Sequence, residues 1–262
     1  MKENKFVKKT ISILGLEEND SLIAPMGFDI AETDTKEECC VLVIGLNPAG
    51  DEKDAERERS SDNTYFYAID ERVGFSKKWM HKQYYLPILR FVEAVVEDKA
   101  KWPWCGKPWN NIDQELSIDI SFPKEHATSK AKKMAVQAIK RFFDERQASK
   151  YTIYIGDMFY YHETKSKKLP LVQGKAAPDY KKYCTEMLED HIRALRDHKK
   201  TVSFVYINNA QVSHFLYGDD DTKTMLECLG VKVFLGGMLS GQRSMDSFST
   251  QRLIQEIRRV SL

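Results

Sequence analysis

An asparagine in a glycine-bearing loop is the side chain of this 262-residue chain that is best placed to do chemistry. Asn47 lies in the sequence Gly-Leu-Asn-Pro-Ala-Gly, directly after the apolar run Val41–Ile44. Gly45 and Gly50 allow a ligand to approach the backbone closely, and Pro48 restricts the turn. An amide can orient a water molecule or a polar ligand, although it is a poor proton acceptor. The alternative is an ordinary turn between a strand and a helix that carries no chemistry.

Four short apolar runs that end in polar or glycine-bearing loops must position this asparagine. Runs without alternation are typical of strands buried on both faces of a parallel sheet. We therefore expect four parallel strands, at residues 40–46, 152–156, 202–207 and 231–235. The carboxyl ends of parallel strands meet at one edge of a sheet, where ligands bind in open α/β folds. The residues expected at that edge are Asn47, Asp157, Asn208 and Gly241.

Helical periodicity separates these strands. Apolar residues at helical spacing predict helices over residues 4–15, 76–96, 130–146, 180–196 and 247–260. The charged stretch Asp51–Asn63 is expected to be a solvent-facing excursion. Strands that alternate with helices indicate the α/β class. We expect one domain over 1–262, with an N-terminal helical extension and a helical insertion around 97–150.

Composition narrows the possible partners and cofactors. The chain has 40 basic and 39 acidic side chains, so any surface for nucleic acid must be local. No apolar run approaches the roughly 18 residues of a membrane-spanning helix, and we expect a cytoplasmic protein. Its five cysteines and six histidines show no metal-ligand spacing, so no metal, iron–sulfur cluster or other cofactor is expected. His162, a few residues beyond the second strand, either contacts a phosphate or caps a turn.

Three segments, Val41–Gly50, Tyr154–Tyr161 and Ser240–Ser244, together resemble the motifs of the uracil-DNA glycosylase superfamily. Val41–Gly50 is similar to the first motif, Gly-x-Asn-Pro-Gly, of the mismatch-specific and single-strand-selective branches. Tyr154–Tyr161 resembles the second core strand with its base-recognition loop. The loop Ser240-Gly241-Gln242-Arg243-Ser244 resembles the Ser-Gly-x-Ser-Arg wedge of the mismatch-specific branch. The resemblance implies a three-layer α/β/α sandwich around a four-stranded parallel sheet.

The resemblance also implies a reaction and a site. In this superfamily a base is flipped out of the DNA, stacked on an aromatic ring and cut from its sugar. Asn47 matches the asparagine that helps to position the attacking water. The residues implied to bind the base are Gly45, Leu46, Pro48, Asp157 and one of Tyr65, Phe66 and Tyr67. The wedge residues Ser240–Ser244 are implied to touch the DNA, and the protein is expected to act as a monomer.

Asp157 departs from the pattern of the superfamily, which often has an asparagine there. A carboxylate accepts a hydrogen bond from a base N–H but cannot donate one to a carbonyl, so it reads a uracil-like edge less well. Two alternatives therefore stay open beside a DNA glycosylase. One is a non-catalytic or retuned member of the fold that binds nucleic acid or nucleotides, and the other is a hydrolase of free nucleosides or nucleotides.

Overall fold

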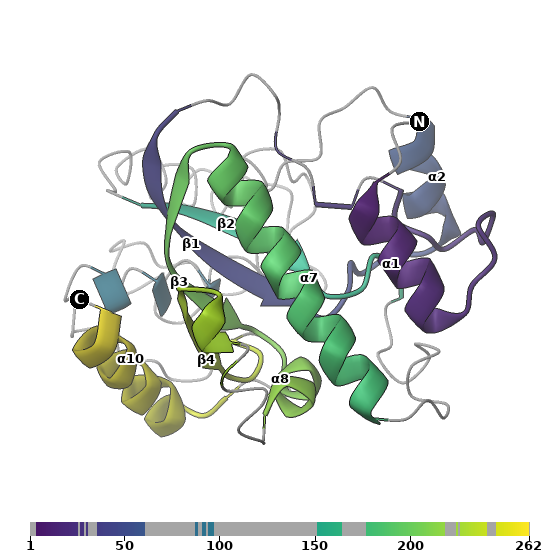
Figure 1. Cartoon of the computed structure of the whole chain (residues 1–262). Coiled ribbons are helices and arrows are strands. Elements are labelled where there is room, and N and C mark those ends of the chain that lie inside the picture. Colours follow the sequence, from purple (N-terminus) through teal and green to yellow (C-terminus); the bar gives the residue numbers. More distant parts are fainter. Residues whose placement is uncertain are drawn as a thin grey trace, which may run out of the picture. The chain divides into compact units, whose positions relative to one another are not determined.

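A computed structural model of the chain gives the fold (Figure 1). It describes residues 4–25, 27–28, 30, 36–60, 87–88, 91–92, 94–96, 151–163, 177–217, 224, 226–239 and 245–261. The chain divides into two compact units, 1–68 with 153–237 and 69–152 with 238–262, and each is described by itself. The single-domain organisation expected from the sequence stays a prediction. The expected helix at 130–146 and the expected insertion around 97–150 lie outside the described residues.

The first unit is built on a four-stranded parallel sheet. The strands are β1 (Glu38–Gly45), β2 (Thr152–Asp157), β3 (Lys200–Ile207) and β4 (Lys232–Leu235). Their order is β2-β1-β3-β4, with β1 beside β3 and β3 beside β4 in parallel register. The four predicted strands and their parallel direction are therefore confirmed, and the chain has an α/β fold.

Both faces of β1 are buried, as its unbroken apolar run predicts. Leu42 and Ile44 belong to the main hydrophobic core. Val41 and Val43 point to the opposite face and are also fully buried. Because β1 is a central strand, its end carries Asn47 into the middle of the sheet edge.

One long helix crosses one face of this sheet (Figure 1). It is α7 (Ala177–Asp197), which contacts β3, the short helix α8 (Ala210–Leu216) and the N-terminal helix α1 (Lys5–Leu14). A stripe of side chains at helical spacing attaches α7 to the core. Its members are Tyr180, Tyr183, Cys184, Met187, Leu188, Ile192 and Leu195. The predicted helices at 180–196 and 4–15 are thereby confirmed.

Helix α1 has a defined beginning and end. The Asn4 side chain accepts the Phe6 N–H at its start. Gly15 ends the helix in the left-handed conformation at φ 65°, which a residue without Cβ adopts at little cost. The side chains that α1 buries are Phe6, Thr10 and Leu14, one turn apart.

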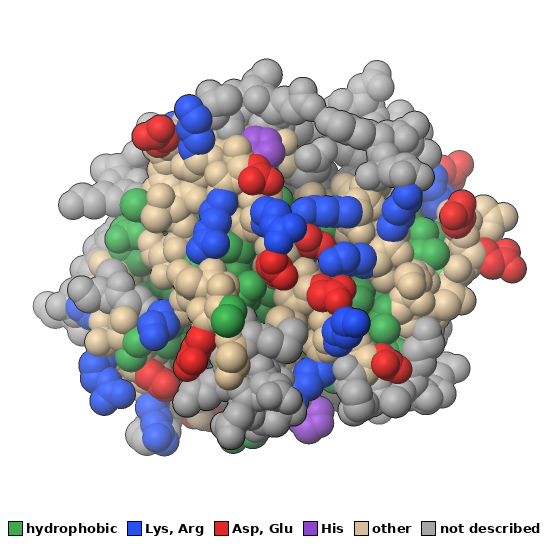
Figure 2. Space-filling view, viewed as in Figure 1, with side chains coloured by type: hydrophobic (Ala, Val, Ile, Leu, Met, Phe, Trp, Pro, Cys, Tyr) green, Lys and Arg blue, Asp and Glu red, His purple; other side chains and the backbone are tan. Residues whose placement is uncertain are grey.

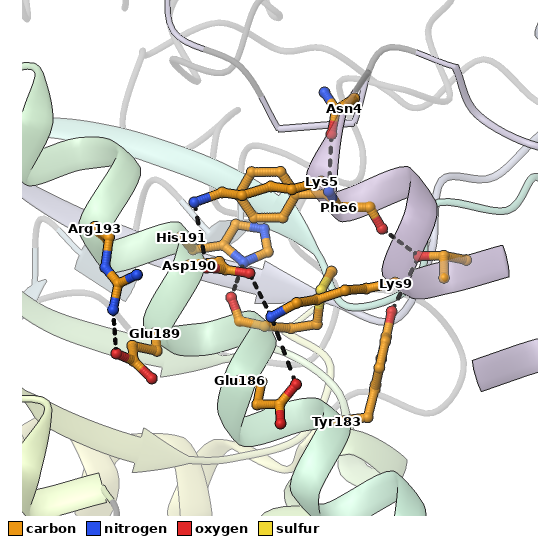
Figure 3. Close-up of polar contacts among 12 residues, drawn as sticks. Asn4, Lys5, Phe6, Lys9, Tyr183, Glu186, Glu189, Asp190, His191 and Arg193 are labelled. Atoms are coloured by element: carbon orange, nitrogen blue, oxygen red, sulfur yellow. Dashed lines mark hydrogen bonds and ion pairs between the residues drawn. The ribbon is translucent and has the colours of Figure 1, made fainter. Parts of the chain in front are cut away.

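Two lysines of α1 hold it against α7 (Figure 3). Lys5 Nζ lies 3.2 Å from one carboxylate oxygen of Asp190, and Lys9 Nζ lies 2.7 Å from the other. Burial alone would raise the pKa of Asp190, but the neighbouring Lys9 and Lys5 outweigh it and hold that pKa below its ordinary value. The two ion pairs therefore persist well into the acidic range.

The charged stretch after Asn47 forms a helix, α2 (Glu52–Ser60). The expected excursion is thus helical over this part, and Ala55 is the buried residue among the α2 side chains that the structure describes. Arg59 donates to the carbonyl oxygens of Asp20 and Ser21, both at 3.0 Å. Helix α2 is therefore fixed to the segment between α1 and β1 by polar contacts rather than by an apolar stripe.

The second unit contributes a C-terminal helix, α10 (Ser247–Ser261), which confirms the helix predicted at 247–260. The Asp246 carboxylate caps it by accepting the Ser249 N–H at 2.8 Å and the Ser249 hydroxyl at 2.7 Å. Helical residues are also found at 87–88, 91–92 and 94–96, within the helix predicted at 76–96.

The amino edge of the sheet is closed by a buried ion pair. The Lys200 ammonium lies 3.1 Å from the Glu38 carboxylate and donates to the Lys36 carbonyl at 2.7 Å. The Tyr154 hydroxyl donates to the same carboxylate at 2.9 Å. The starts of β1, β2 and β3 are therefore joined at the edge opposite Asn47.

Candidate functional site

The loops that follow β1 and β2 are bonded directly to each other. The Met158 N–H donates to the Gly45 carbonyl at 3.0 Å, and the Phe159 N–H donates to the Leu46 carbonyl at 2.8 Å. On the other side, the Asn208 N–H donates to the Ile44 carbonyl at 2.8 Å. Parallel strands of this order bring Asn47, Asp157 and Asn208 to one edge, as the sequence predicts.

Asn47 acts as a clip between these two loops. Its Nδ2 donates to the carbonyl oxygens of Pro48 at 3.0 Å, Tyr161 at 3.0 Å and Glu163 at 2.9 Å. Three carbonyl oxygens around one end of the amide identify that end as the nitrogen. Two N–H groups share three acceptors, so this end has no donor left for a ligand. No hydrogen bond within the described ranges uses Oδ1, which is the part of Asn47 that can still accept.

Residues 158–163, which we call the β2 loop, also have hydrogen-bond partners for their backbone away from Asn47. The Glu163 N–H donates to the Pro48 carbonyl at 3.2 Å, and the His162 N–H donates to the Leu22 carbonyl at 2.7 Å. Ile23 pairs with Tyr161 in an isolated antiparallel bridge. A loop held at this many points is preorganised, and its shape does not depend on a ligand.

The side chains of the β2 loop point into the protein. Met158, Phe159, Tyr160, Tyr161 and His162 are all less than a tenth exposed. The apolar composition of this segment is typical of a buried loop, whereas the resemblance implies a base-recognition loop. Its rings therefore build the core beneath the site and present no stacking surface to solvent.

Asp157 and Asn208 are the polar side chains at the ends of the strands that flank β1. They are 7% and 1% exposed, respectively. The Asp157 N–H lies 3.5 Å from the Tyr160 hydroxyl, a long contact at the end of β2. Two buried polar side chains on either side of the Asn47 loop give this edge the functional groups to bind a polar ligand.

His162 lies beneath the Asn47 loop and does not face solvent. Its Nε2 is 3.1 Å from a carboxylate oxygen of Glu58, close enough for an ion pair when the ring is protonated but not aligned as a hydrogen bond. A Cβ on Gly50 would lie 2.6 Å from His162 Nδ1, so only glycine fits where the ring packs. The ring joins α2 to the loop, and at 2% exposure it is not placed to contact a phosphate.

A second buried histidine supports β2 from α7. His191 Nδ1 lies 2.6 Å from the Met187 carbonyl and therefore carries the proton, so Nε2 accepts from the Tyr160 hydroxyl at 2.9 Å. Burial lowers the pKa of His191 to about 4, against smaller opposing effects of the Met187 carbonyl and Asp190. A Cβ on Gly156 would lie 2.8 Å from this ring. The imidazole is thus a neutral structural group packed directly against β2.

Carboxylates gather on the α2 side of the candidate site. Burial raises the pKa of Tyr161, and Asp20, Glu163 and Glu52 add to the rise. The first turn of α2 is capped by the protein itself, because Asp51 Oδ1 accepts the Lys53 N–H at 3.0 Å. A helix N-terminus at this place in an α/β fold often binds phosphate, but here an acidic side chain occupies it.

The face formed by α1 and α7 carries charges of both signs (Figure 2). Arg193 pairs with Glu189 along α7, and Lys9 lies 3.6 Å from Glu186. A groove of about 350 Å³ along the second half of α7 is lined by Arg193, Arg196 and Leu229, among others. None of its lining residues comes from the Asn47 or β2 loops, so it is separate from the candidate site.

Two groups of expected site residues lie outside the described residues. They are the aromatic candidates Tyr65, Phe66 and Tyr67 and the wedge Ser240–Ser244. Within the described ranges, no three histidine, cysteine or acidic side chains are grouped to hold a metal ion. No helix in that part of the chain is long and apolar enough to cross a membrane. Comparison with protein-family models, curated proteins and solved structures finds no match.

Proposed function

We propose that this chain hydrolyses the N-glycosidic bond of a modified or mismatched base in DNA, as a uracil-DNA glycosylase-like enzyme. The observation that carries the proposal is the Asn47 clip. It fixes a Gly-x-Asn-Pro loop and the end of β2 together at the carboxyl edge of a parallel sheet. This is the edge at which α/β folds bind ligands, and the loop there is rigid before any ligand arrives.

The two halves of the Asn47 amide have different roles in this proposal. The nitrogen holds the β2 loop, whereas Oδ1 accepts a hydrogen bond from the attacking water and orients it. Asp157 accepts a hydrogen bond from a ring N–H of the flipped base. Gly45, Leu46 and Pro48 form the wall beside the base, one of Tyr65, Phe66 and Tyr67 stacks on it, and Ser240–Ser244 touch the DNA.

The proposal includes a three-layer α/β/α sandwich. Helices α1, α7 and α8 belong to the unit of the sheet, and α7 covers one face (Figure 1). The full burial of Val41 and Val43 on the other face supports a second covering layer.

A second candidate is a hydrolase of free nucleosides. The carboxylates of Asp20, Glu52 and Glu163 beside Tyr161 favour it, because they repel phosphate groups at this side of the site. An uncharged nucleoside meets no such penalty.

A substrate panel tests both candidates. Labelled oligonucleotides that carry uracil, hypoxanthine, xanthine or mismatched thymine are incubated with the protein and then cleaved at abasic sites with alkali. The matching free nucleosides are assayed by chromatography for release of the base. Strand cleavage supports the glycosylase, and base release from nucleosides alone supports the second candidate. No release from any substrate would contradict both.

The role of Asn47 is tested by Asn47→Ala. Losing the water-orienting oxygen should lower the single-turnover rate by roughly 10²-fold, since the interaction matters chiefly in the transition state. Asn209→Ala is the matched control, because the Asn209 side chain only caps α8 by accepting the N–H groups of Gln211 and Val212. Both variants are assayed at a temperature below their thermal unfolding midpoints. Equal rates for Asn47→Ala and the parent would remove Asn47 from the mechanism.

A further inference from the structure

A buried threonine of the N-terminal helix is bonded to the β2 loop. Thr10 is fully buried, and its hydroxyl accepts the Tyr160 N–H at 3.1 Å. The same hydroxyl lies 3.0 Å from the Tyr183 hydroxyl and 3.0 Å from the Phe6 carbonyl. The Tyr183 hydroxyl in turn donates to the Met158 carbonyl at 2.8 Å. Two side chains from two helices thus hold the backbone immediately after Asp157.

The direction of these hydrogen bonds follows from the number of protons. Tyr183 has one hydroxyl proton, which goes to the Met158 carbonyl. Thr10 therefore donates its own proton at the contact with Tyr183 or to the Phe6 carbonyl, and it receives the proton of the Tyr160 N–H. The Tyr160 N–H, the two hydroxyls at 3.0 Å from each other and the Met158 carbonyl together form a ring around residues 158–160. Whether Thr10 donates to Tyr183 or to Phe6, Thr10 and Tyr183 each bind the backbone of this loop directly.

The surroundings keep this ring intact. Burial raises the pKa of Tyr183 far above its ordinary value, so its hydroxyl stays protonated at all ordinary pH values. Tyr183 extends from α7 toward α1 (Figure 3), and Lys9 ties the two helices together through Asp190. The ring therefore depends on α1 remaining docked on α7.

We propose that Thr10 is a positioning residue of the candidate site, and that α1 is part of the site rather than an appendage. Thr10 fixes the backbone of residues 158–160 and through it the orientation of the Asp157 carboxylate toward the ligand. This inference rests on the proposed function for the role of Asp157. Through this ring α1 takes part in base recognition, although Thr10 lies 150 residues before Tyr160 in the sequence.

The chain offers a matched control for Thr10. Thr185 is a buried threonine of α7, and its hydroxyl donates to the carbonyl four residues earlier, that of Lys181, at 3.1 Å. Thr10 makes the same type of bond within α1. Thr10→Val and Thr185→Val thus remove the same hydroxyl from a helix, but only Thr10→Val removes a bond to the β2 loop.

The experiment compares Thr10→Val, Thr10→Ser and Thr185→Val in the full chain. Amide hydrogen exchange at Tyr160 should rise at least about tenfold in Thr10→Val beyond any change in global stability, because one hydrogen bond of the loop is lost. The titration of the Asp157 carboxyl, followed by carbon NMR, should move in the same variant. Thr10→Ser should restore both, and Thr185→Val should leave both unchanged.

The rate of base release then connects this geometry to the reaction. Thr10→Val should lower the single-turnover rate by about tenfold with recovery in Thr10→Ser, since a displaced carboxylate reads the base less well. If Thr10→Val matches Thr185→Val in exchange and in the Asp157 titration, the positioning role is wrong. Faster exchange with an unmoved Asp157 titration also overturns it. A parent that releases no base contradicts the proposed function alone, because the two NMR measurements decide the role of Thr10 without activity.

Discussion

Acidification should destabilise this fold through one histidine. His191 is fully buried and neutral in the folded state, where its pKa is about 4, whereas the ordinary value is 6.5. Between these pH values the unfolded chain binds a proton that the folded chain excludes, so the free energy of unfolding falls as the pH falls. One pKa unit corresponds to roughly 1.4 kcal/mol, so the loss between pH 7 and pH 4 is about 3 kcal/mol. The stability is fully present above pH 6.5 and is lost toward pH 4.

Urea unfolding at a series of pH values measures this loss. His191→Gln should remove most of the pH dependence in this window. His198→Gln is the matched control, because His198 directly follows α7 and its ring likewise lies against the carbonyl four residues earlier, that of Ala194, but is partly exposed. Asp190 does not mask the effect, since its pKa is held below its ordinary value. The reasoning would be refuted if His191→Gln kept the pH dependence of the parent's stability, or if His191 in the folded parent titrated near pH 6.5 by NMR.

Three further substitutions test other parts of the fold by urea unfolding at neutral pH. Asn47→Asp puts an acceptor-only carboxylate against three carbonyl oxygens and should lower the free energy of unfolding by at least about 3 kcal/mol. Part of this loss should be recovered in a second series at acidic pH, where the carboxyl can donate. Equal stability of the variant at both pH values would contradict the role of Asn47 in joining the two loops. Lys200→Met leaves the largely buried Glu38 carboxylate with the exposed Lys36 ammonium at 3.5 Å as its remaining cation and should cost about 1–3 kcal/mol, while the added change Glu38→Gln should recover part of it. Gly236→Ala would place a Cβ 2.4 Å from the hydroxyl of the buried Tyr206 and should lower the free energy of unfolding by about 1–3 kcal/mol. An unchanged urea midpoint would show that the Tyr206 ring moves aside.

The sheet could be predicted because its signals are local. The unbroken run Val41–Ile44 indicates a strand covered on both faces, and the structure buries all four residues completely. The stripe along α7 likewise follows from helical spacing alone. Strand direction then brings Asn47 and Asp157 to one edge, because all four strands run the same way.

The connections of the site could not be predicted, because they depend on distant pairs. Nothing around Asn47 indicates that its amide would bind the carbonyl of Glu163, 116 residues later. Thr10 stands between Lys9 and Ile11 in α1, and no local pattern indicates that its hydroxyl contacts Tyr183 of α7 and the Tyr160 N–H. Helix α2 does not follow from periodicity, because Ala55 is the buried residue among its described side chains and the stretch has no apolar stripe. Pattern reasoning detects burial, whereas polar pairing requires the fold.

The Asn47 clip also bears on how the protein is made. It joins segments 114 and 116 residues apart, and the strands that flank β1 begin only at Thr152 and Lys200. A nascent chain on the ribosome that has emerged only as far as Asn47 therefore exposes an apolar strand before either flanking strand exists. Until β2 arrives, the segment Val41–Ile44 is open to association with other chains. Chaperone contact during synthesis would thus fall on the same strand that later carries the candidate site.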